Sequence, residues 1–443
     1  MARPVIMWFR RDLRIAEHAA LAAAAASGPV VALFVVDPAF GRAGRARHDA
    51  LAGALASLHR AVDGCLVIRT GSPGDVVPAV AAEAGAAEVF VTRDANPYGR
   101  RRDAEVAGAL RGLGATLHGV GWNYAVGPGT VGKPDGTPYA VFTPFARAWH
   151  GHLAPARAPT PEPQWRALPG EPLPLPMSPG AELSERAVRN RWAAFVGGGL
   201  DRYAHDRDRP DVDGTSQMSA ALRWGVVHPA ALLGDLGQGE SSERFATELI
   251  WREFYADVLL RHPRSAWSNL NGRMDAMPVD TGPEALAAFD RWRTGTTGFP
   301  IIDAGMRQLA TTGWMHNRAR MLVASFLVKD LHLPWQWGAR HFLDHLYDGD
   351  LASNNHGWQW CAGTGTDAAP YFRIFNPTTQ SRRFDPDGQY IRRYVPELRA
   401  LSGVIVHEPG LLRPPGYPAP MVDHATERAD ALARYRHAVT GTR

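Results

Sequence analysis

The chain has 443 residues, of which 45% are hydrophobic and 21% are charged, a composition that excludes a largely disordered protein. This length predicts two or three domains, and the net charge of +4 indicates only a weak preference for anionic partners. The two cysteines, Cys65 and Cys361, exclude a disulfide framework and a cysteine-built zinc site. They favour a reducing cytoplasm, and we expect no metal site.

We expect no targeting or membrane segment. The first residues lack the basic and apolar regions of a signal peptide. The most apolar stretch, residues 19–36, is interrupted by Ser27-Gly28-Pro29, which indicates a helix end followed by a strand. The sequence therefore predicts a soluble cytoplasmic protein.

Apolar runs alternate with Ala- and Leu-rich segments of helical period through the first 125 residues. This alternation implies right-handed crossovers and a doubly wound, five-stranded parallel sheet. The first run is followed by Phe9-Arg10-Arg11-Asp12 and not by G-x-G-x-x-G, so a dinucleotide held by that fingerprint is not expected here. The predicted strands are Val5–Phe9, Val30–Val36, Leu66–Arg69, Glu88–Thr92 and Thr116–Val120, and predicted helices include His48–Val62 and Arg101–Leu113.

The composition and the hydrophobic pattern change twice along the rest of the chain. Nine of the 25 residues from Pro155 to Pro179 are proline, which predicts an extended linker. Beyond residue 183 the pattern is amphipathic and helical. We therefore predict an α/β domain at 1–128, an extended Pro-rich linker at 129–183 and an all-helical domain at 184–443. Helical period is clearest at Leu249–Leu260, Pro300–Thr311, Ala319–Leu331 and Arg340–Leu346.

One polar stretch and three sets of residues in the predicted helical domain could carry chemistry. The stretch Asp213–Ser219 is rich in hydroxyl groups and opens a helical region, which suits either a pyrophosphate or a plain N-cap. Glu248, Trp251 and Arg252 share one helix face, as do Asn317, Arg318 and Met321. Buried charges are costly unless paired, so several such sets exceed what packing requires. The remaining set is Asp348, Asp350, Asn354, Trp358 and Trp360.

The run Thr364–Pro377, followed by Arg382-Arg383, is polar, aromatic and basic. Aromatic side chains can stack on bases and arginines can contact phosphates, so this run could be a nucleic-acid surface. A structured loop explains the same composition equally well.

These motifs together resemble the photolyase/cryptochrome family, most closely its class I cyclobutane pyrimidine dimer (CPD) photolyases. The similarity spans nearly the whole chain, from Trp8–Arg14 to the segment 418–436. Its most specific parts are Glu248–Tyr255, Gly298–Asp303, Gly313–Arg318, Asn354-Asn355, Trp358-Gln359-Trp360 and Thr364–Pro377.

The resemblance implies FAD, folded in a U, within a C-terminal helical FAD-binding domain. Asn354 would lie near flavin N5, where a neutral amide suits the reduced anionic flavin. The phosphates would be held by Tyr203, Thr215, Ser216, Gln217, Met218 and Ser219, and the flavin or adenine side by Arg320, Asp348 and Asp350.

The resemblance also implies a pocket for a CPD flipped out of damaged DNA. Trp251 and Trp360 would wall it, because stacking compensates for the cost of unstacking the lesion. Glu248 would hydrogen-bond the dimer and stabilise its radical anion after electron transfer from excited reduced FAD. Asn317 and Met321 would complete the pocket, and the phosphate contacts would come from Arg207, Arg252, Arg318 and Arg373.

Lesion choice follows from three of these positions. Relatives that repair (6-4) photoproducts carry histidines where this chain has Asn317 and Met321, and a glutamine where it has Glu248. Proton transfer is needed for that lesion and not for splitting a cyclobutane ring. We therefore expect light-driven CPD repair on single- or double-stranded DNA by a monomer. The alternatives are a cryptochrome-like FAD photoreceptor without repair activity and a DNA-binding module without photochemistry.

The chain departs from the family pattern in three places. Of the three tryptophans through which relatives photoreduce their flavin, Trp358 and Trp335 match the first two, but the third falls at Val279. Trp337 or Trp267 could substitute, and slow photoreduction is the hypothesis. Met218 and Ala220 replace leucine and proline, a conservative change. His356 replaces a common glycine, and the sequence does not indicate its role.

A second, light-harvesting chromophore is also implied. The segment Asn96–Asp103 resembles that of relatives that bind 8-hydroxy-5-deazaflavin, and it lacks the glutamate with which folate-binding members hold their pterin. We favour the deazaflavin, with methenyltetrahydrofolate second and no antenna third.

Overall fold

The computed structural model describes residues 2–153, 160–174, 183–367 and 373–440. The chain divides into two compact units. We call residues 1–201 with 216–263 the sheet unit, and residues 202–215 with 264–443 the helical unit. These units group residues by their contacts, whereas the predicted domains are continuous stretches of sequence. The predicted domain boundaries at residues 128 and 183 therefore stay predictions.

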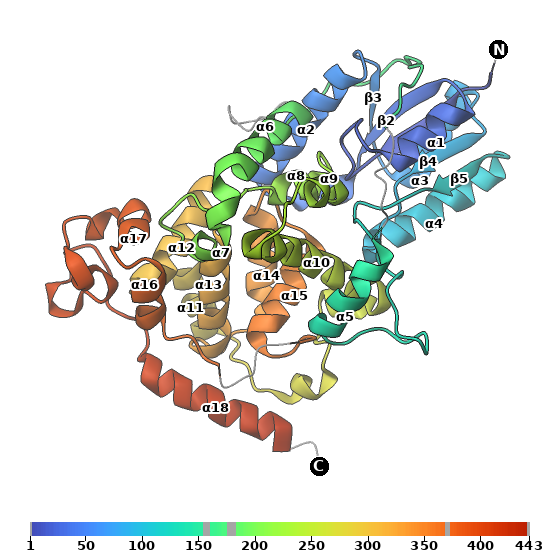
Figure 1. The fold of residues 1–443 in the computed structure, drawn as a ribbon. Coiled ribbons are helices and arrows are strands. Elements are labelled where there is room, and N and C mark those ends of the chain that lie inside the picture. The colour runs from blue at the N-terminus through green and yellow to red at the C-terminus, as the bar shows by residue number, and fades with distance from the viewer. Residues whose placement is uncertain (1, 154–159, 175–182, 368–372, 441–443) are drawn as a thin grey trace. The chain divides into compact units, whose positions relative to one another are not determined.

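The sheet unit contains the predicted doubly wound, five-stranded parallel sheet (Figure 1), with strand order β3-β2-β1-β4-β5. The central strand β1 is buried along its whole length, as expected for a parallel strand covered on both faces. The carboxyl ends of β1 and β4 are neighbours, and the strand order reverses between them. The strands are β1 (Val5–Phe9), β2 (Val30–Val36), β3 (Leu66–Thr70), β4 (Glu88–Val91) and β5 (Thr116–Gly119).

Helices of the sheet unit begin earlier than their apolar pattern predicts. Helix α4 starts at Pro97, because proline at the first helical position gives up an N–H that is unpaired there anyway. Helix α10 starts at Glu240, because its first turn is polar and carries no periodic signal. The helices are α1 (Ala19–Ser27), α2 (Arg45–Ala61), α3 (Pro73–Ala84), α4 (Pro97–Gly112), α5 (Phe142–Trp149), α6 (Glu185–Ala194), α8 (Ser219–Trp224), α9 (Pro229–Gly234) and α10 (Glu240–Arg261).

The predicted extended segment 129–183 is partly helical. Helix α5 lies inside it, ahead of the proline-rich stretch 155–179. Residues 160–174 contain no helix and run along the sheet: the N–H of Val30 donates to the carbonyl of Gln164 at 2.8 Å, and the N–H of Glu171 donates to that of Ile68 at 3.0 Å. Residues 154–159 and 175–182 of the predicted linker lie outside the described residues.

The helical unit packs around a core that includes Trp292, Ile302 and Phe326. Buried Asp303 ties three segments of this unit together. Its carboxylate accepts bonds from the N–H and hydroxyl of Thr297, the N–H of Gly298 and the hydroxyl of Tyr417, at 2.6–3.1 Å. The helices are α7 (Tyr203–Asp206), α11 (Pro283–Arg293), α12 (Pro300–Thr312), α13 (Asn317–Lys329), α14 (Trp335–His345), α15 (Leu351–Ala362), α16 (Pro377–Phe384), α17 (Gln389–Tyr394) and α18 (His424–Thr440).

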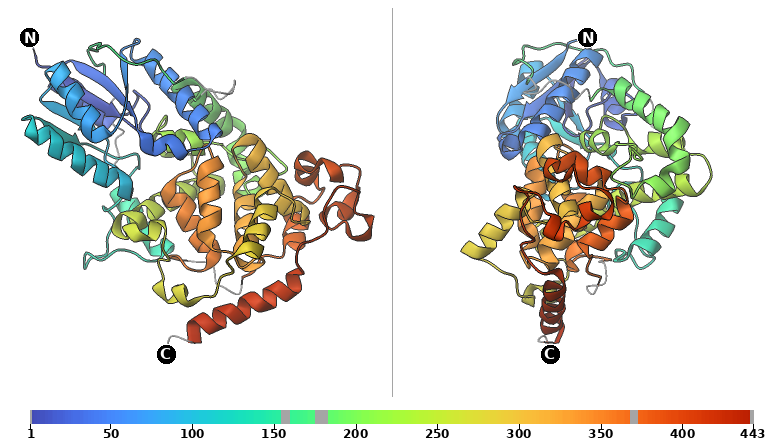
Figure 2. Two further views of the ribbon diagram at one scale, coloured as in Figure 1. Left: turned by 180° about the vertical axis from the view of Figure 1, so that it is seen from behind. Right: turned by 90° about the vertical axis from the view of Figure 1, so that its left-hand side faces the viewer.

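Helix α18 runs along the outside of the helical unit (Figure 2). Ion pairs hold it there: His332 Nε2 lies 2.8 Å from a carboxylate oxygen of Glu427, and Arg434 pairs with Asp280 at 2.6 Å. Among the described residues, no helix combines the length and apolar character needed to cross a membrane.

Candidate active site

Helix α10 carries the first predicted set in the sheet unit. Glu248, Trp251 and Arg252 are each half-buried on it. Arg252 donates from Nη1 to the carbonyl of Asn123 at 2.8 Å and from Nη2 to that of Leu222 at 3.2 Å. Arg252 therefore joins α10 to the backbone of α8, and its contact with a phosphate stays a prediction.

Phe142 fixes the plane of the Trp251 indole. The two rings stack with centroids 3.7 Å apart and planes 4° from parallel. Phe142 opens helix α5, and Phe145 and Trp149 continue the buried face of that helix. The extended-linker prediction missed this contact, although apolar residues at i, i+3 and i+7 are the signal of an amphipathic helix.

Glu253 anchors the same turn of α10 to the loop before α5. This side chain is only 3% exposed, and its carboxylate accepts bonds from Trp149 Nε1 at 2.6 Å and from the N–H groups of Ala125 and Val126. Burial raises the pKa of Glu253. The sequence pattern does not predict this role of Glu253; its only signal is a carboxylate between Trp251 and the apolar end of α10.

The predicted phosphate-binding residues are divided between the two units. In the sheet unit, buried Ser216 accepts the N–H of Met218 at 3.4 Å, and Gln217 has a left-handed φ of 53°. In the helical unit, a Cβ on Gly214 would lie 2.5 Å from that of Asp206, so the chain before Thr215 packs closely on α7. The segment thus turns sharply and presents hydroxyl groups and N–H groups. Tyr203 is buried and Ser219 is exposed.

Helix α13 carries the second set, in the helical unit. Asn317 is exposed, and Met321 is half-buried one turn later. Arg318 pairs with Asp208 at 2.7 Å and stacks over the ring of Phe384 at 4.2 Å. The N-cap is His316, which accepts the N–H of Arg318 at 3.1 Å.

Arg320 is paired with one of the two predicted carboxylates. Its Nη2 donates to both oxygens of buried Asp348, at 2.8 and 3.1 Å, and its Nε donates to the carbonyl of Met315 at 2.8 Å. The other carboxylate, Asp350, caps α15 by accepting the N–H of Ser353 at 3.1 Å. The structure therefore brings Arg320 and Asp348 together and places Asp350 at the start of the helix that carries Asn354.

The amide of Asn354 has a defined orientation. Its Nδ2 donates to the carbonyl of Ala339 at 3.0 Å and to Oδ1 of Asn355 at 2.8 Å. Fully buried Asn355 donates in turn to the carbonyl of Ala266, which fixes its own amide orientation. Both hydrogens of Asn354 are therefore used, and its oxygen is left as an acceptor. The sequence does not predict this orienting role of Asn355.

His356 has a structural role. Its Nδ1 donates to the carbonyl of Ala352 at 2.8 Å, so its Nε2 accepts the hydroxyl of Ser265 at 2.9 Å. The ring is buried and ties α15 to the segment before α11.

Trp358 lies directly against helix α14. A Cβ built on Gly338 would be 2.1 Å from Cη2 of the Trp358 indole. This helix also carries Trp335 one turn before Gly338. The Trp358 ring further contacts Trp292, with centroids 6.0 Å apart, and Phe342, at 5.0 Å.

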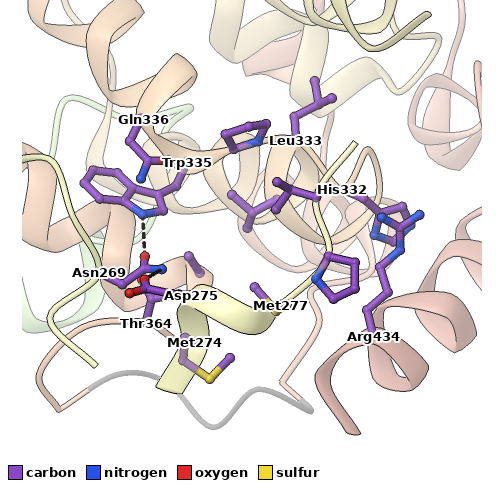
Figure 3. Close-up of a pocket in the computed structure, with 15 residues that line it drawn as sticks. Asn269, Met274, Asp275, Met277, His332, Leu333, Trp335, Gln336, Thr364 and Arg434 are labelled. Carbon is purple, nitrogen blue, oxygen red and sulfur yellow. Dashed lines mark hydrogen bonds between the residues drawn. The ribbon is translucent and has the colours of Figure 1, made fainter. Parts of the chain in front are cut away.

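Trp335 lines a pocket of about 160 Å³ in the helical unit. Its Nε1 donates to Asn269 Oδ1 at 2.9 Å (Figure 3). Val279 lines the same pocket and is 43% exposed. The residue matched to the missing third tryptophan thus shares a pocket with Trp335.

The other predicted site residues are dispersed within the helical unit. Arg207 stacks over the ring of Tyr203 at 5.6 Å. Trp360 is half-buried against the helical core. Arg373 is exposed, and its guanidinium lies 5.7 Å from the centre of the Phe375 ring. Residues 368–372 of the predicted nucleic-acid surface lie outside the described residues.

The switch point of the sheet is filled by ion pairs. Arg10 pairs with Asp103, and Arg102 pairs with Asp103 at 2.9 Å and lies 3.6 Å from Asp94. Asp12 accepts the hydroxyl of Thr92 at 2.6 Å. Arg10, Asp12, Thr92 and Asp94 line a crevice of about 20 Å³ at this place.

The two halves of the chain match two family descriptions. Residues 5–164 match "DNA photolyase", and residues 245–437 match "FAD binding domain of DNA photolyase". A doubly wound sheet and a helical FAD-binding domain define the class as a flavoprotein.

Individual relatives agree with this class. A curated deoxyribodipyrimidine photo-lyase of Escherichia coli is 38% identical, with 98% of this chain and 99% of that protein covered. A class III photolyase from Agrobacterium tumefaciens has a TM-score of 0.90 at 35% identity, over 99% of this chain and 98% of that one. A Synechocystis cryptochrome has a TM-score of 0.88 at 27% identity, over 98% and 99%. The chain belongs to the DNA photolyase family and is an enzyme of the photo-lyase type.

Proposed function

We propose that this protein repairs cyclobutane pyrimidine dimers in damaged DNA with light, as a class I enzyme. The observation that carries the proposal is the match, across nearly both full lengths, to a relative named for deoxyribodipyrimidines. When bound, reduced FAD would supply one electron to the dimer on excitation and recover it once the ring has opened. The residues of this chain would bind, orient and protect both partners.

The residues present fit FAD. The turn at residues 215–219 offers hydroxyl and N–H donors for a pyrophosphate. Arg320 is held by Asp348 at a fixed position, where it would contact the flavin or adenine side. Tyr203 and Asp350 would complete the site, as the resemblance implies.

Asn354 would orient toward flavin N5 with its oxygen. Because both of its amide hydrogens are donated elsewhere, the side chain can only accept there. Reduced flavin carries a hydrogen on N5, whereas oxidised flavin does not. Asn354 would therefore favour the reduced form, and Asn355 would be the residue that keeps it in this orientation.

The resemblance to the family implies a lesion pocket built from residues of α10, α13 and α15. Trp251, fixed by Phe142, and Trp360 would stack on the flipped bases. Glu248 would accept hydrogen bonds from the dimer, and Asn317 with Met321 would complete the wall. Phosphate contacts would come from Arg207, Arg252, Arg318 and Arg373, the last of which is exposed.

The direct test is to illuminate the purified, reduced protein with an oligonucleotide that contains one dimer. We expect thymine absorbance to return under blue or near-ultraviolet light and to stay lost in the dark. The second candidate is a photoreceptor without repair activity, which the likeness to a cryptochrome structure favours. Flavin bound but no thymine recovered in the light would support that candidate instead.

Replacing Glu248 with alanine is expected to lower the repair yield by roughly tenfold, because a hydrogen bond to a charged group contributes about 1.5–3 kcal/mol. FAD content should stay near that of the wild type. The readouts are thymine recovered per absorbed photon and flavin absorbance per protein. The control is Glu243→Ala, an exposed carboxylate on the same helix, which should repair normally. Loss of flavin from Glu248→Ala would show that this side chain faces the cofactor.

Replacing Val279 with tryptophan is expected to accelerate photoreduction of bound oxidised flavin. The new indole would enter the pocket that Trp335 lines and would pass an electron from an external thiol toward Trp335 and Trp358. The measurement is the rate of flavin bleaching under blue light, together with transient absorption of a tryptophan radical. Val279→Phe is the matched control, because it adds a ring that is much harder to oxidise. Equal rates in the wild type and in Val279→Trp would contradict this route.

Trp337 and Trp267 are the two candidates to replace the third tryptophan in electron transfer. Trp337 is better placed to pass an electron to Trp358. Phe289 contacts both Trp337 and Trp292, each with centroids 5.5 Å apart, and Trp292 contacts Trp358. The ring of Trp267 instead lies under the guanidinium of Arg340, at 4.1 Å, where a nearby positive charge opposes oxidation of the indole.

For the antenna we propose 8-hydroxy-5-deazaflavin on the exposed side of Asn96–Asp103. Arg102 and Asp103 are used in ion pairs, whereas Tyr98 is exposed and stacks with Arg101 at 5.6 Å. The chromophore released by denaturing protein from cells that make both candidates would identify it by absorbance and mass.

A further inference from the structure

Lysine is almost absent from this chain. It has 46 arginines and two lysines, Lys133 and Lys329. Lys133 is exposed, whereas Lys329 is only 2% exposed. A lysine ammonium is a compact point charge, and an arginine guanidinium is a broad planar fork. In a chain that uses arginine nearly everywhere, a buried lysine indicates a position that requires the smaller head group.

The head group of Lys329 is directed at one stretch of backbone. Lys329 is the last residue of α13, and its Nζ donates to the carbonyl of Arg373 at 3.1 Å. Among the described residues, the charged and titratable groups that act on it most strongly are Cys361 on α15, Asp330 and Arg373. Burial raises the pKa of Cys361 to about 12, so this group stays a neutral thiol, and Asp330 is bound to His424.

The backbone that Lys329 contacts leads into α16. Phe375 is buried in the helical core, and Asn376 caps α16 by accepting the N–H of Thr379 at 2.8 Å. The chain from 375 onward is therefore held by packing and by a helix cap. The side chain of Arg373 is exposed, and its backbone carbonyl is held by the hydrogen bond from the buried Lys329.

We propose that Lys329 is a positioning residue for DNA: it holds the Arg373 carbonyl so that the exposed guanidinium of Arg373 meets a phosphate beside the lesion. The inference rests on the proposed function, because it takes the Arg373 side of the helical unit as part of the DNA-binding surface. Lys329 itself does not touch the substrate.

Burying the ammonium group of Lys329 lowers the stability of the fold, which favours a functional reason for this lysine. Burial lowers the pKa of Lys329 to about 8, below its usual value of 10.5. Between these values the unfolded chain binds more protons than the folded one, so stability rises with pH across this window. At neutral pH the buried ammonium therefore lowers stability, while its charge strengthens the bond to the Arg373 carbonyl.

The test is a double-mutant cycle on affinity for a dimer-containing oligonucleotide. We expect Lys329→Met and Arg373→Ala each to weaken binding by about fivefold, as for loss of one phosphate contact. The double variant should bind like Arg373→Ala alone, because Lys329 acts through Arg373. Lys329→Arg should not restore binding, since the fork is too large. Unchanged affinity in Lys329→Met, or an undiminished effect in the Arg373→Ala background, would overturn the proposal.

A pH series separates positioning from general stability. The affinity advantage of the wild type over Lys329→Met should shrink as pH rises through about 8, where the ammonium is lost; a constant ratio would argue against the proposal. Labelling lysine Cε with carbon-13 gives two signals in the intact protein, with Lys133 as the internal reference. A midpoint for Lys329 clearly below that of Lys133 supports the proposal. Equal midpoints would show an exposed ammonium that does not hold the Arg373 carbonyl, which overturns the proposal even if the variants fail to fold. Failure of the wild type to prefer dimer-containing DNA would instead refute the proposed function.

Discussion

Replacing Gly338 with alanine is expected to displace the Trp358 indole and to destabilise the helical unit by about 2 kcal/mol or more. The added methyl group would lie 2.1, 2.5 and 2.6 Å from three carbons of that ring, far inside van der Waals contact. The indole is only 3% exposed and is bounded by Trp292 and Phe342, so it has little room to move. The ordinary gain of alanine over glycine in a helix, about 0.5–1 kcal/mol, is too small to offset the overlap.

Near-ultraviolet circular dichroism, urea unfolding and the rate of flavin photoreduction measure the consequences of this substitution. Under the proposed electron route, photoreduction should be nearly lost, because Trp358 would no longer hold its position. The control is Gly108→Ala in α4, where the new methyl group would meet only the tip of Arg111, at 3.7 Å. That variant should be as stable as the wild type or slightly more stable. Wild-type stability and photoreduction in Gly338→Ala would show that Trp358 can repack.

The sheet could be predicted from the sequence because β1 and β2 are unbroken apolar runs and the shorter apolar runs after them alternate with helical segments. Val30–Val36, for example, consists of β-branched and apolar residues bounded by turn residues, and the structure gives it the predicted limits. The helix starts could not be predicted as well. The first turn of α14, which contains Trp335, has no apolar period of its own, because tertiary contacts and not local pattern hold it.

The candidate site shows the same division between local and long-range information. Glu248 and Trp251 share one helix face by spacing alone, so the sequence could place them together. The roles of Phe142 and Gly338 depend on partners about 110 and 20 residues away, Trp251 and Trp358. No local pattern encodes such pairs, and only the folded chain reveals them.

The sequence alone did not predict which basic side chains contact DNA and which bind the protein's own backbone. Arg252 looks like a phosphate ligand in the sequence, yet in the structure it donates to two backbone carbonyls. Lys329 belongs to no recognised motif. In the structure it is buried, and its ammonium group donates to the backbone carbonyl of the exposed Arg373. The sequence indicates that a charge exists, whereas burial and partners decide its use.

Replacing Asp303 with alanine is expected to cost the helical unit about 4 kcal/mol or more. Four buried donors would lose their acceptor, and each such loss costs about 1–3 kcal/mol. They are the N–H and the hydroxyl of Thr297, the N–H of Gly298 and the hydroxyl of Tyr417. Gly298 cannot move to find another partner, because even a Cβ there would lie 2.3 Å from the carbonyl oxygen of Ala419. The protein should therefore unfold at a much lower urea concentration and lose its FAD-binding capacity as a consequence.

Two further variants define what that loss means. Tyr417→Phe removes a donor together with its bond, so it should cost only about 1 kcal/mol. Asp290→Ala removes a carboxylate whose ion pair with Arg293 is 60% and 47% exposed, and exposed pairs contribute about 0–1 kcal/mol. The measurement is the urea midpoint of unfolding, followed by circular dichroism. We expect the midpoint of Asp303→Ala to lie far below that of Tyr417→Phe, and the midpoint of Tyr417→Phe to lie at or below that of Asp290→Ala. An Asp303→Ala midpoint close to that of Asp290→Ala would mean that the turn at Gly298 is held by packing and not by this carboxylate.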